Sequence, residues 1–348
     1  MTGGLGVKRP TIPDLAAAAG VSVATVNRVI SEADSVRQAT RERVLQAAEE
    51  IGFYGIRTIE NSVKSSRGSY RIGVLLHQGN RTFYRNLGDA LRRAAEQSPD
   101  GKVDLKLEFL DDLSPETIAT RLIALGTNCD SVALVAAEHP MISDAIDSVL
   151  ASGTPVTGLI APLSARGNVC FVGLDNWKVG RTAAWAFDRM VREPGKIGIL
   201  VGNHRYRNQE LNESGFRSYM REHNSAFTLL EPRATYESSN VAREITEEML
   251  AEHPDLCGLF ISGGGITGAL AALRAHQRRN DFVAVGYELF DATRAALIDG
   301  TLNFVISHPM ETFAREAVAT MVRAKKAGTE VGALNVTLGF EIYTPENV

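Results

Sequence analysis

The glycine-rich run Gly263-Gly264-Gly265-Ile266-Thr267-Gly268 has a spacing that could cradle a phosphate. It fits the pattern G-x-G-x-x-G between an apolar stretch typical of a strand and a stretch typical of a helix. Glu288 lies 20 residues beyond Gly268, where an acid would bind the ribose of a dinucleotide. The pattern normally marks the first β-α unit of its domain, whereas several such units precede it here. A dinucleotide-dependent enzyme therefore stays as the alternative, and the glycines could instead bring the backbone close to a ligand or to a facing lobe.

No other group of residues has the spacing of a catalytic or metal site. The sequence contains neither a G-x-S-x-G elbow nor an H-E-x-x-H pattern, and its 7 histidines are scattered. Cys129, Cys170 and Cys257 lie far apart, without disulfide or zinc spacing. We therefore expect no catalysis, no metal and no cofactor, and the cysteine usage favours a reducing cytoplasm.

Three short helices are expected near the amino terminus. Apolar residues recur at helical spacing over 12–19 and stop before Gly20, Ser22 can cap a second helix over 22–30, and a third is expected over 38–51. A helix, a tight glycine turn, a short helix and a supporting helix form a helix-turn-helix unit, which places its second helix in the major groove of DNA. A pair of surface helices without a nucleic-acid role is the alternative for such a pattern alone.

The run from Thr11 to Gly52, TIPDLAAAAGVSVATVNRVI and then VRQATRERVLQAAEEIGF, resembles the DNA-binding segment of the LacI family of bacterial transcriptional regulators. The family's A-G-V-S-x-x-T-V-x-R-V core is intact. The resemblance implies that Val23 and Ala24 make apolar contacts with base edges. It implies that Asn27 and Arg28 reach bases one turn further along, and that Ser22 and Thr25 donate to phosphates. Asn27 stands where serine is usual, which could alter the base preference.

Residues 56–71 are polar, with few large apolar side chains, and we expect a hinge or linker there. LacI-family members usually carry Pro-Asn at this point, followed by a hinge helix with a leucine that wedges into the minor groove. Here Tyr54-Gly55-Ile56-Arg57 replaces the Pro-Asn. The resemblance implies Val63, or else Ile59, as the wedge. A flexible tether is the alternative.

From residue 72 onward, apolar strands alternate with amphipathic helices, which implies parallel sheets covered on both faces. Ten strands are more than one compact sheet usually holds, so we expect two lobes, with ligands at the carboxyl ends of the strands. The expected strands are 71–77, 103–110, 131–136, 155–160, 169–174, 196–201, 227–231, 257–262, 282–287 and 303–308. The expected domains are 1–55, 56–71 and 72–348, and residues 334–348 are expected as a strand and tail.

Residues 72–343 resemble the ligand-binding core of the same family, which is akin to periplasmic sugar-binding proteins, on stretches such as IGVLL at 72–76 and VGLDNWKVGRTAA at 172–184. The fold class implied is α/β, with a small all-α helix-turn-helix head and a two-lobed core of the periplasmic-binding-protein type. An aromatic side chain would pack on the C–H face of a sugar while amides and a carboxylate bind its hydroxyls. The implied effector residues are Asn80, Phe83, Tyr84, Asn212, Ser262, Glu288 and His308.

Two departures from the family bear on the effector. Asn212 stands where an arginine is usual, and Ala161-Pro162 replaces an acid after the fourth strand. These changes argue against a common hexose or pentose. The missing positive charge could come from His204, Arg205 or Arg207. Asp175-Asn176 is expected to cap the following helix.

The composition is that of a packed globular protein, with 348 residues, 44% hydrophobic and 22% charged. Residues 1–71 carry 10 Lys and Arg against 7 Asp and Glu, whereas the remainder carries 27 against 34. This mild basic bias is weak support for a nucleic-acid partner. No stretch approaches 18 consecutive apolar residues and the start has no apolar signal region, so neither a membrane partner nor secretion is expected.

Together these patterns predict a cytoplasmic transcriptional regulator. They favour a repressor over an activator. A sugar, sugar alcohol or derivative would control its affinity for double-stranded operator DNA. We expect a homodimer, because the chain ends without the heptad-bearing helix of tetrameric relatives.

Overall fold

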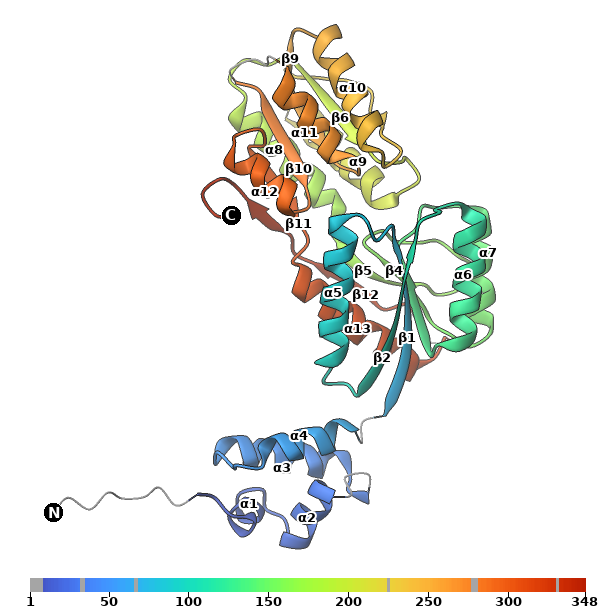
Figure 1. The fold of residues 1–348 in the computed structure, drawn as a ribbon, viewed down its shortest axis with the longest axis vertical. Coiled ribbons are helices and arrows are strands. Elements are labelled where there is room, and N and C mark those ends of the chain that lie inside the picture. The colour runs from blue at the N-terminus through green and yellow to red at the C-terminus, as the bar shows by residue number, and fades with distance from the viewer. Residues whose placement is uncertain (1–8, 32–34, 66–67, 224–225, 277–280, 330–331) are drawn as a thin grey trace, which may run out of the picture. The chain divides into compact units, whose positions relative to one another are not determined.

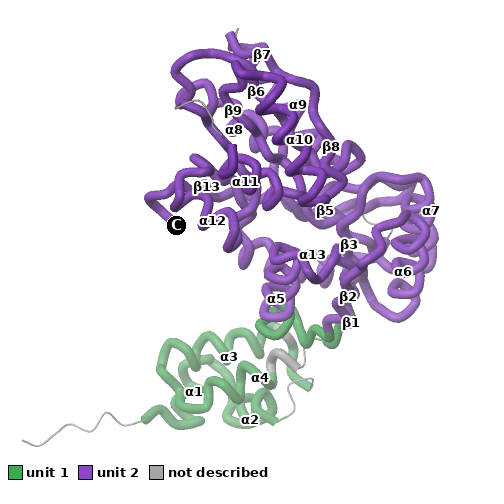
Figure 2. The backbone as a smooth tube through the Cα atoms, turned by 45° about the horizontal axis from the view of Figure 1, so that its top comes forward, with its two compact units in different colours: residues 1–71, 95–104 green, residues 72–94, 105–348 purple. Residues whose placement is uncertain are grey.

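The computed structural model describes residues 9–31, 35–65, 68–223, 226–276, 281–329 and 332–348 (Figure 1). The chain forms two compact units, residues 1–71 with 95–104 and residues 72–94 with 105–348 (Figure 2).

The first three helices of the head (residues 9–65) are those predicted. They are α1 (Ile12–Ala18), α2 (Val23–Ser31) and α3 (Gln38–Glu50). Thr11 donates its backbone N–H (2.8 Å) and hydroxyl (2.6 Å) to the Asp14 carboxylate where α1 begins. Gly20 has a φ of +62°, a left-handed turn that glycine adopts without strain. Ser22 Oγ then accepts from the Thr25 N–H at 3.1 Å, which starts α2.

The first part of the expected hinge or linker, residues 56–65, forms a fourth helix, α4 (Ile56–Ser65), rather than a flexible tether. Ile59 is fully buried in the same apolar core as Leu15, Val26 and Val44. Ile56 packs against that core more loosely. The helix is thus ordered by contacts within the head itself, since burying Ile59 completes a core that three short helices leave small.

The second unit contains two largely parallel sheets (Figure 1). The sheet of the first lobe has the order β12-β5-β4-β3-β1-β2, and that of the second lobe β13-β11-β10-β9-β6-β7, with β8 also beside β6. Only β13 runs antiparallel to its neighbour among the pairs described. The strands are β1 (Ser69–His77), β2 (Lys102–Leu110), β3 (Ser131–Leu134), β4 (Val156–Leu159), β5 (Cys170–Leu174), β6 (Lys196–Val201), β7 (Thr228–Leu229), β8 (Arg233–Ala234), β9 (Leu256–Ile261), β10 (Val283–Tyr287), β11 (Phe304–Ser307), β12 (Asn335–Leu338) and β13 (Glu341–Tyr343).

All ten predicted strand regions contain a strand, and the expectation of two lobes is confirmed. Helices lie on both faces of each sheet, as parallel strands require. Those of the first lobe are α5 (Thr82–Glu96), α6 (Pro115–Asn128), α7 (Pro140–Ala151) and α13 (Met310–Ala327). Those of the second are α8 (Asn176–Met190), α9 (Arg207–Glu222), α10 (Ser239–Glu252), α11 (Ile266–Ala275) and α12 (Asp291–Ile298).

The chain passes between the lobes at three places: from β5 to α8, from β11 to α13, and from β12 to β13. Asp175 lies at the first of them and caps α8 as predicted, with Oδ1 accepting from the Lys178 N–H at 3.2 Å. Short connections of this kind are where two lobes can hinge around a ligand.

Candidate nucleic-acid and effector sites

The six residues predicted to meet DNA lie on the free side of α2 and at its start. Val23 is 42% exposed, Ala24, Asn27 and Arg28 are also exposed, and Thr25 is half-buried. On the opposite side Val26 and Val29 are fully buried in the head core. The helix is therefore held by its apolar side, and its amide and guanidinium side chains remain available.

The hydroxyls at the start of α2 already contact each other. Ser22 Oγ lies 2.9 Å from Thr25 Oγ1, and Ser22 is exposed. Two hydroxyls beside the free N–H groups of a helix start can donate to one phosphate. Contact with DNA stays a prediction for all six residues.

The two hinge residues differ in what the structure shows. Ile59 is fully buried in the head core, so in this conformation it has no surface with which to enter a minor groove. Val63 belongs to α4, but its side chain lies outside the described residues. Of the two, only Val63 stays a candidate for a wedge while α4 is packed in this way.

A cavity of about 460 Å³ lies between the two lobes, within the 300–1,000 Å³ range of small-molecule sites. It opens at the carboxyl ends of β1, β4, β9 and β10, where the sequence placed ligand contacts. Five of the seven predicted effector residues line it, namely Asn80, Phe83, Tyr84, Ser262 and Glu288.

The other two predicted residues, Asn212 and His308, lie behind the cavity wall rather than in it. The fully buried Asn212 amide is 3.0 Å from both the Asn176 amide and the Ser262 hydroxyl, in either orientation of the amide. His308 Nδ1 lies 2.5 Å from Glu288 Oε1. These two residues therefore position Ser262 and Glu288, which line the cavity.

The carboxylate of Glu288 is held on several sides. Its Oε2 accepts from the Ser307 hydroxyl at 3.2 Å and from the His308 backbone N–H at 3.3 Å. Glu288 itself has a φ of +72°, in the left-handed region that is uncommon for residues other than glycine. Burial, and next the Glu288 charge, raises the pKa of Tyr287 well above its ordinary value, so the phenol stays neutral.

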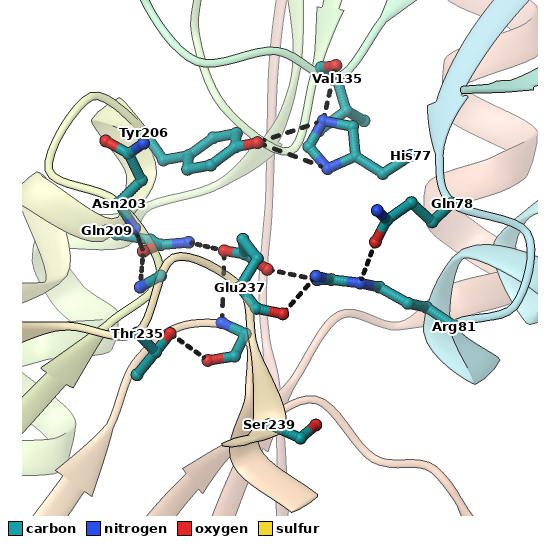
Figure 3. Close-up of polar contacts among 12 residues, drawn as sticks. His77, Gln78, Arg81, Val135, Asn203, Tyr206, Gln209, Thr235, Glu237 and Ser239 are labelled. Atoms are coloured by element: carbon teal, nitrogen blue, oxygen red, sulfur yellow. Dashed lines mark hydrogen bonds and ion pairs between the residues drawn. The ribbon is translucent and has the colours of Figure 1, made fainter. Parts of the chain in front are cut away.

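Two charged residues that line the cavity, Arg81 and Glu237, were not predicted from the sequence (Figure 3). Arg81 comes from the loop between β1 and α5 of the first lobe, and Glu237 from the loop between β8 and α10 of the second. Arg81 donates to both the carboxylate and the backbone carbonyl of Glu237. Arg81 could have been predicted, because it directly follows the predicted effector residue Asn80. No sequence pattern marks the loop that carries Glu237.

The sequence suggested that the segment 204–207 supplies the positive charge in the cavity. That charge comes from Arg81 instead. The Arg205 carbonyl accepts from the Glu138 N–H at 2.8 Å, and the Arg207 guanidinium donates to Ser164 Oγ at 3.1 Å. Both contacts reach the first lobe. None of His204, Arg205 and Arg207 lines the cavity.

The same segment contributes Tyr206, whose hydroxyl lies 3.5 and 3.4 Å from Nδ1 and Nε2 of His77 (Figure 3). His77 Nε2 is also 3.0 Å from the Val135 carbonyl. Burial lowers the pKa of His77 from 6.5 to about 4, although the nearby Glu237 acts in the opposite direction. His77 is consequently neutral at pH 7.

The glycine loop at 263–265 receives a carboxylate of the protein itself. The Gly264 N–H donates to Glu237 Oε1 at 3.4 Å, and the acid expected to bind a ribose, Glu288, is bound to His308. The dinucleotide-dependent alternative thus finds no support in this loop. Within the described ranges no three His, Cys, Asp or Glu side chains cluster as a metal site, and no helix is long and apolar enough to cross a membrane.

Family models match both parts of the chain. Residues 11–55 match the bacterial regulatory proteins of the lacI family, and residues 72–330 match a periplasmic binding protein domain. The chain is a member of the lacI family. The predicted resemblance and fold class are thereby confirmed.

Relatives of known function include other lacI-type regulators. The HTH-type transcriptional regulator CelR of Thermobifida fusca is 27% identical over 328 residues, which cover 90% of this chain and 92% of CelR. The regulator IdnR of Escherichia coli is 25% identical, over 96% and 97% of the two chains. Matches to three further regulators, at 34–40% identity, span only 22–34% of the length of those proteins.

Among solved structures, GanP, a glucose-galactose binding protein from Geobacillus stearothermophilus, superimposes with a TM-score of 0.72. The matched region covers 81% of this chain and 99% of GanP at 16% identity, so the similarity concerns the fold alone. The two-lobed unit of this lacI-family member therefore has the architecture of periplasmic sugar-binding proteins.

Proposed function

We propose that this lacI-family member is a transcriptional repressor that binds operator DNA as a homodimer and is controlled by a small polyhydroxylated effector. The observation that carries the proposal is the division of α2 into two sides. Val26 and Val29 fix the helix in the head core, while Asn27 and Arg28 project from it. A short anchored helix with exposed base-reading side chains is what a major-groove reader requires.

The cavity supports the effector part of the proposal. Phe83, Tyr84 and Phe290 supply flat apolar surfaces, and Ser262 and Glu288 supply polar atoms, a combination suited to a sugar ring or polyol. Relatives of the same architecture include a glucose-galactose binding protein. Because the cavity has walls in both lobes, a ligand there would change the angle between them.

A change of lobe angle would alter the geometry with which two heads meet DNA. Such coupling needs only about 1–3 kcal/mol, or about a 5–150-fold change in operator affinity. A dimer presents two heads, so we propose a pseudo-palindromic operator. We also place the protein in the cytoplasm, where operator DNA and effector meet, and propose that it has no catalytic activity.

Selection from a random duplex library tests this function directly. We expect the purified chain to enrich one pseudo-palindromic sequence, with a log K against log salt slope of several units. A panel of sugars, polyols and sugar acids, added to the selected duplex in a gel-shift assay, should contain compounds that change the affinity. Binding without any enriched sequence, or a slope near zero, would contradict the DNA-binding role.

A further inference from the structure

The two lobes are joined across the cavity by the Arg81–Glu237 ion pair (Figure 3). Besides its two hydrogen bonds to Glu237, Arg81 donates from Nε to Gln78 Oε1 at 2.9 Å. Three of the five guanidinium N–H groups are thus committed. The side chains of Arg81 and Glu237 are only 23% and 12% exposed, so this pair is screened less than a surface pair.

Two glycines, Gly202 and Gly264, lie directly against the carboxylate of Glu237. A Cβ added to Gly202 would lie 1.7 Å from Glu237 Oε1, and one added to Gly264 would lie 1.8 Å from Oε2. Gln209 Nε2 donates to Oε1 at 3.3 Å from the same side. Any larger residue at either glycine would push the carboxylate away from Arg81.

The backbone that presents Glu237 is held in an unusual conformation. Tyr236 and Glu237 have φ angles of +50° and +61°, two successive residues in the left-handed region. Thr235 Oγ1 donates to the Gly264 carbonyl at 2.7 Å, and the Ser238 N–H donates to the Thr235 carbonyl at 2.9 Å. A strained loop persists only when its surroundings impose it, and here those surroundings fix the position of the carboxylate.

With this pair in place, the formal charge left facing the cavity is negative. Among the described lining residues the charged ones are Arg81, Glu237 and Glu288, a formal balance of −1. Asn208 also lines the cavity, is 4% exposed, and its Oδ1 has no donor among the described residues. Buried acceptors require donors, and hydroxyl groups supply them.

We infer that the Arg81–Glu237 pair makes this cavity select an uncharged polyhydroxylated effector and reject the carboxylate form of the same skeleton. The inference rests on the proposed function in one respect, namely that the cavity holds the effector. An entering carboxylate brings acceptors to a site that already has them. To replace Glu237 as the partner of Arg81, it must leave the Glu237 charge unpaired in a mostly buried position.

Matched probes test the inference in the purified full chain. Thermal unfolding is followed with the sugar alcohol and the aldonate of the same skeleton, namely galactitol and D-galactonate, D-glucitol and D-gluconate, and ribitol and D-ribonate, at ionic strength held constant with NaCl. Glu237→Gln removes the competing charge, so we expect the apparent affinity for at least one aldonate to rise tenfold or more over the original protein. The double variant Arg81→Gln/Glu237→Gln should lose that gain.

Glu311→Gln is the matched control, because it frees Arg93 from a 2.6 Å ion pair within the first lobe, outside the cavity. It should respond to aldonates as the original protein does. If Glu237→Gln does not fold, Gly202→Ala displaces the carboxylate sterically and should shift aldonate affinity in the same direction.

Two outcomes overturn the inference: an original protein that binds an aldonate as tightly as its neutral partner, or a folded Glu237→Gln variant with no aldonate gain. Neither outcome depends on DNA. Failure of the effector selection is therefore distinguishable from failure of the regulator function, which the duplex selection tests separately.

Discussion

Arg28 is the residue of α2 whose chemistry is most specific, because a guanidinium can bind both acceptors of a guanine edge. We expect Arg28→Ala to cost about 1–3 kcal/mol of binding free energy and to relax the preference at one base position of each half-site. Competition gel shifts against single-base operator variants measure both effects. Arg192→Ala, which removes an exposed arginine of the second unit, serves as the control. An unchanged base preference in Arg28→Ala would assign this residue to the phosphate backbone instead.

His77 gives the second unit a predictable dependence on pH. Its folded pKa, lowered by burial to about 4, lies below the unfolded value of 6.5. Between these values the unfolded chain binds a proton that the folded chain does not, so the free energy of unfolding falls as pH drops from 6.5 toward 4. This residue's share of the loss is about 3 kcal/mol, fully developed only below pH 4.

The His77→Asn variant isolates that share from the carboxylates that titrate in the same range. Urea unfolding at pH 7 and pH 4.5, followed by the fluorescence of Trp177 and Trp185 in α8, reports on this unit. The original protein should lose about 2.5 kcal/mol more than the variant between the two pH values. Parallel losses would mean that His77 takes up its proton in the folded state as readily as in the unfolded one.

The resemblance implied all seven effector residues, and the ends of the strands explain why two of them line the cavity. Ser262 and Glu288 directly follow β9 and β10, and parallel strands bring their carboxyl ends to one edge. Glu237 could not be found, since its place in the cavity depends on a strained loop and on two distant glycines. The resemblance supplied Asn212 and His308, but only the packing shows that they lie behind the wall.

At the scale of elements, α4 is the clearest case in which tertiary contacts override a weak pattern. Its sequence is polar apart from Ile56, Ile59 and Val63, which was too little to distinguish a helix from a linker. The decisive contribution is the burial of Ile59, which depends on core residues supplied by the preceding helices.

Ile59→Ala should therefore destabilise the head by about 2–5 kcal/mol, the usual cost of removing a buried isoleucine side chain. Hydrogen exchange resolved by segment should show faster exchange in α1 to α4, with the second unit unchanged, and operator affinity should fall. Ile298→Ala, at a side chain that is 69% exposed, is the control. Unchanged exchange in the head would show that α4 contributes little to its core.

The strands of the second unit were more predictable than its edges. A continuous apolar run such as 256–261, all of it buried in β9, has few alternatives to an interior strand. The stretch 334–348, expected as a strand and tail, contains β12 in the sheet of the first lobe and a further strand, β13, in that of the second. The sequence of this stretch does not indicate which sheet each strand joins, because the partner of an edge strand depends on where the rest of the fold places it.

At the scale of the whole molecule, the second unit carries both a means of moving and contacts that oppose movement. Three connections between the lobes permit a change of angle. Three contacts join the two lobes. They are the Arg81–Glu237 pair in the cavity, the Tyr206–His77 contact, and the hydrogen bond from Glu138 N–H to the Arg205 carbonyl. An effector can shift such an equilibrium only by its difference in affinity for the two arrangements. Ligand contacts that compete with these interactions therefore shift the equilibrium between the two lobe arrangements most.

The dimer proposal makes a geometric prediction about the operator. Two heads related by a two-fold axis require both half-sites on one face of the duplex, which repeats about every 10.5 base pairs. Inserting five base pairs between the half-sites turns the second away, so affinity should fall to that of an isolated half-site and the salt slope should decrease by about half. Titrations of the intact, expanded and single half-site duplexes at several salt concentrations measure this, alongside the mass of the free protein by sedimentation. Equal affinity for all three duplexes would mean that a single head accounts for binding, and the lobes could then control the operator only through the head of their own chain.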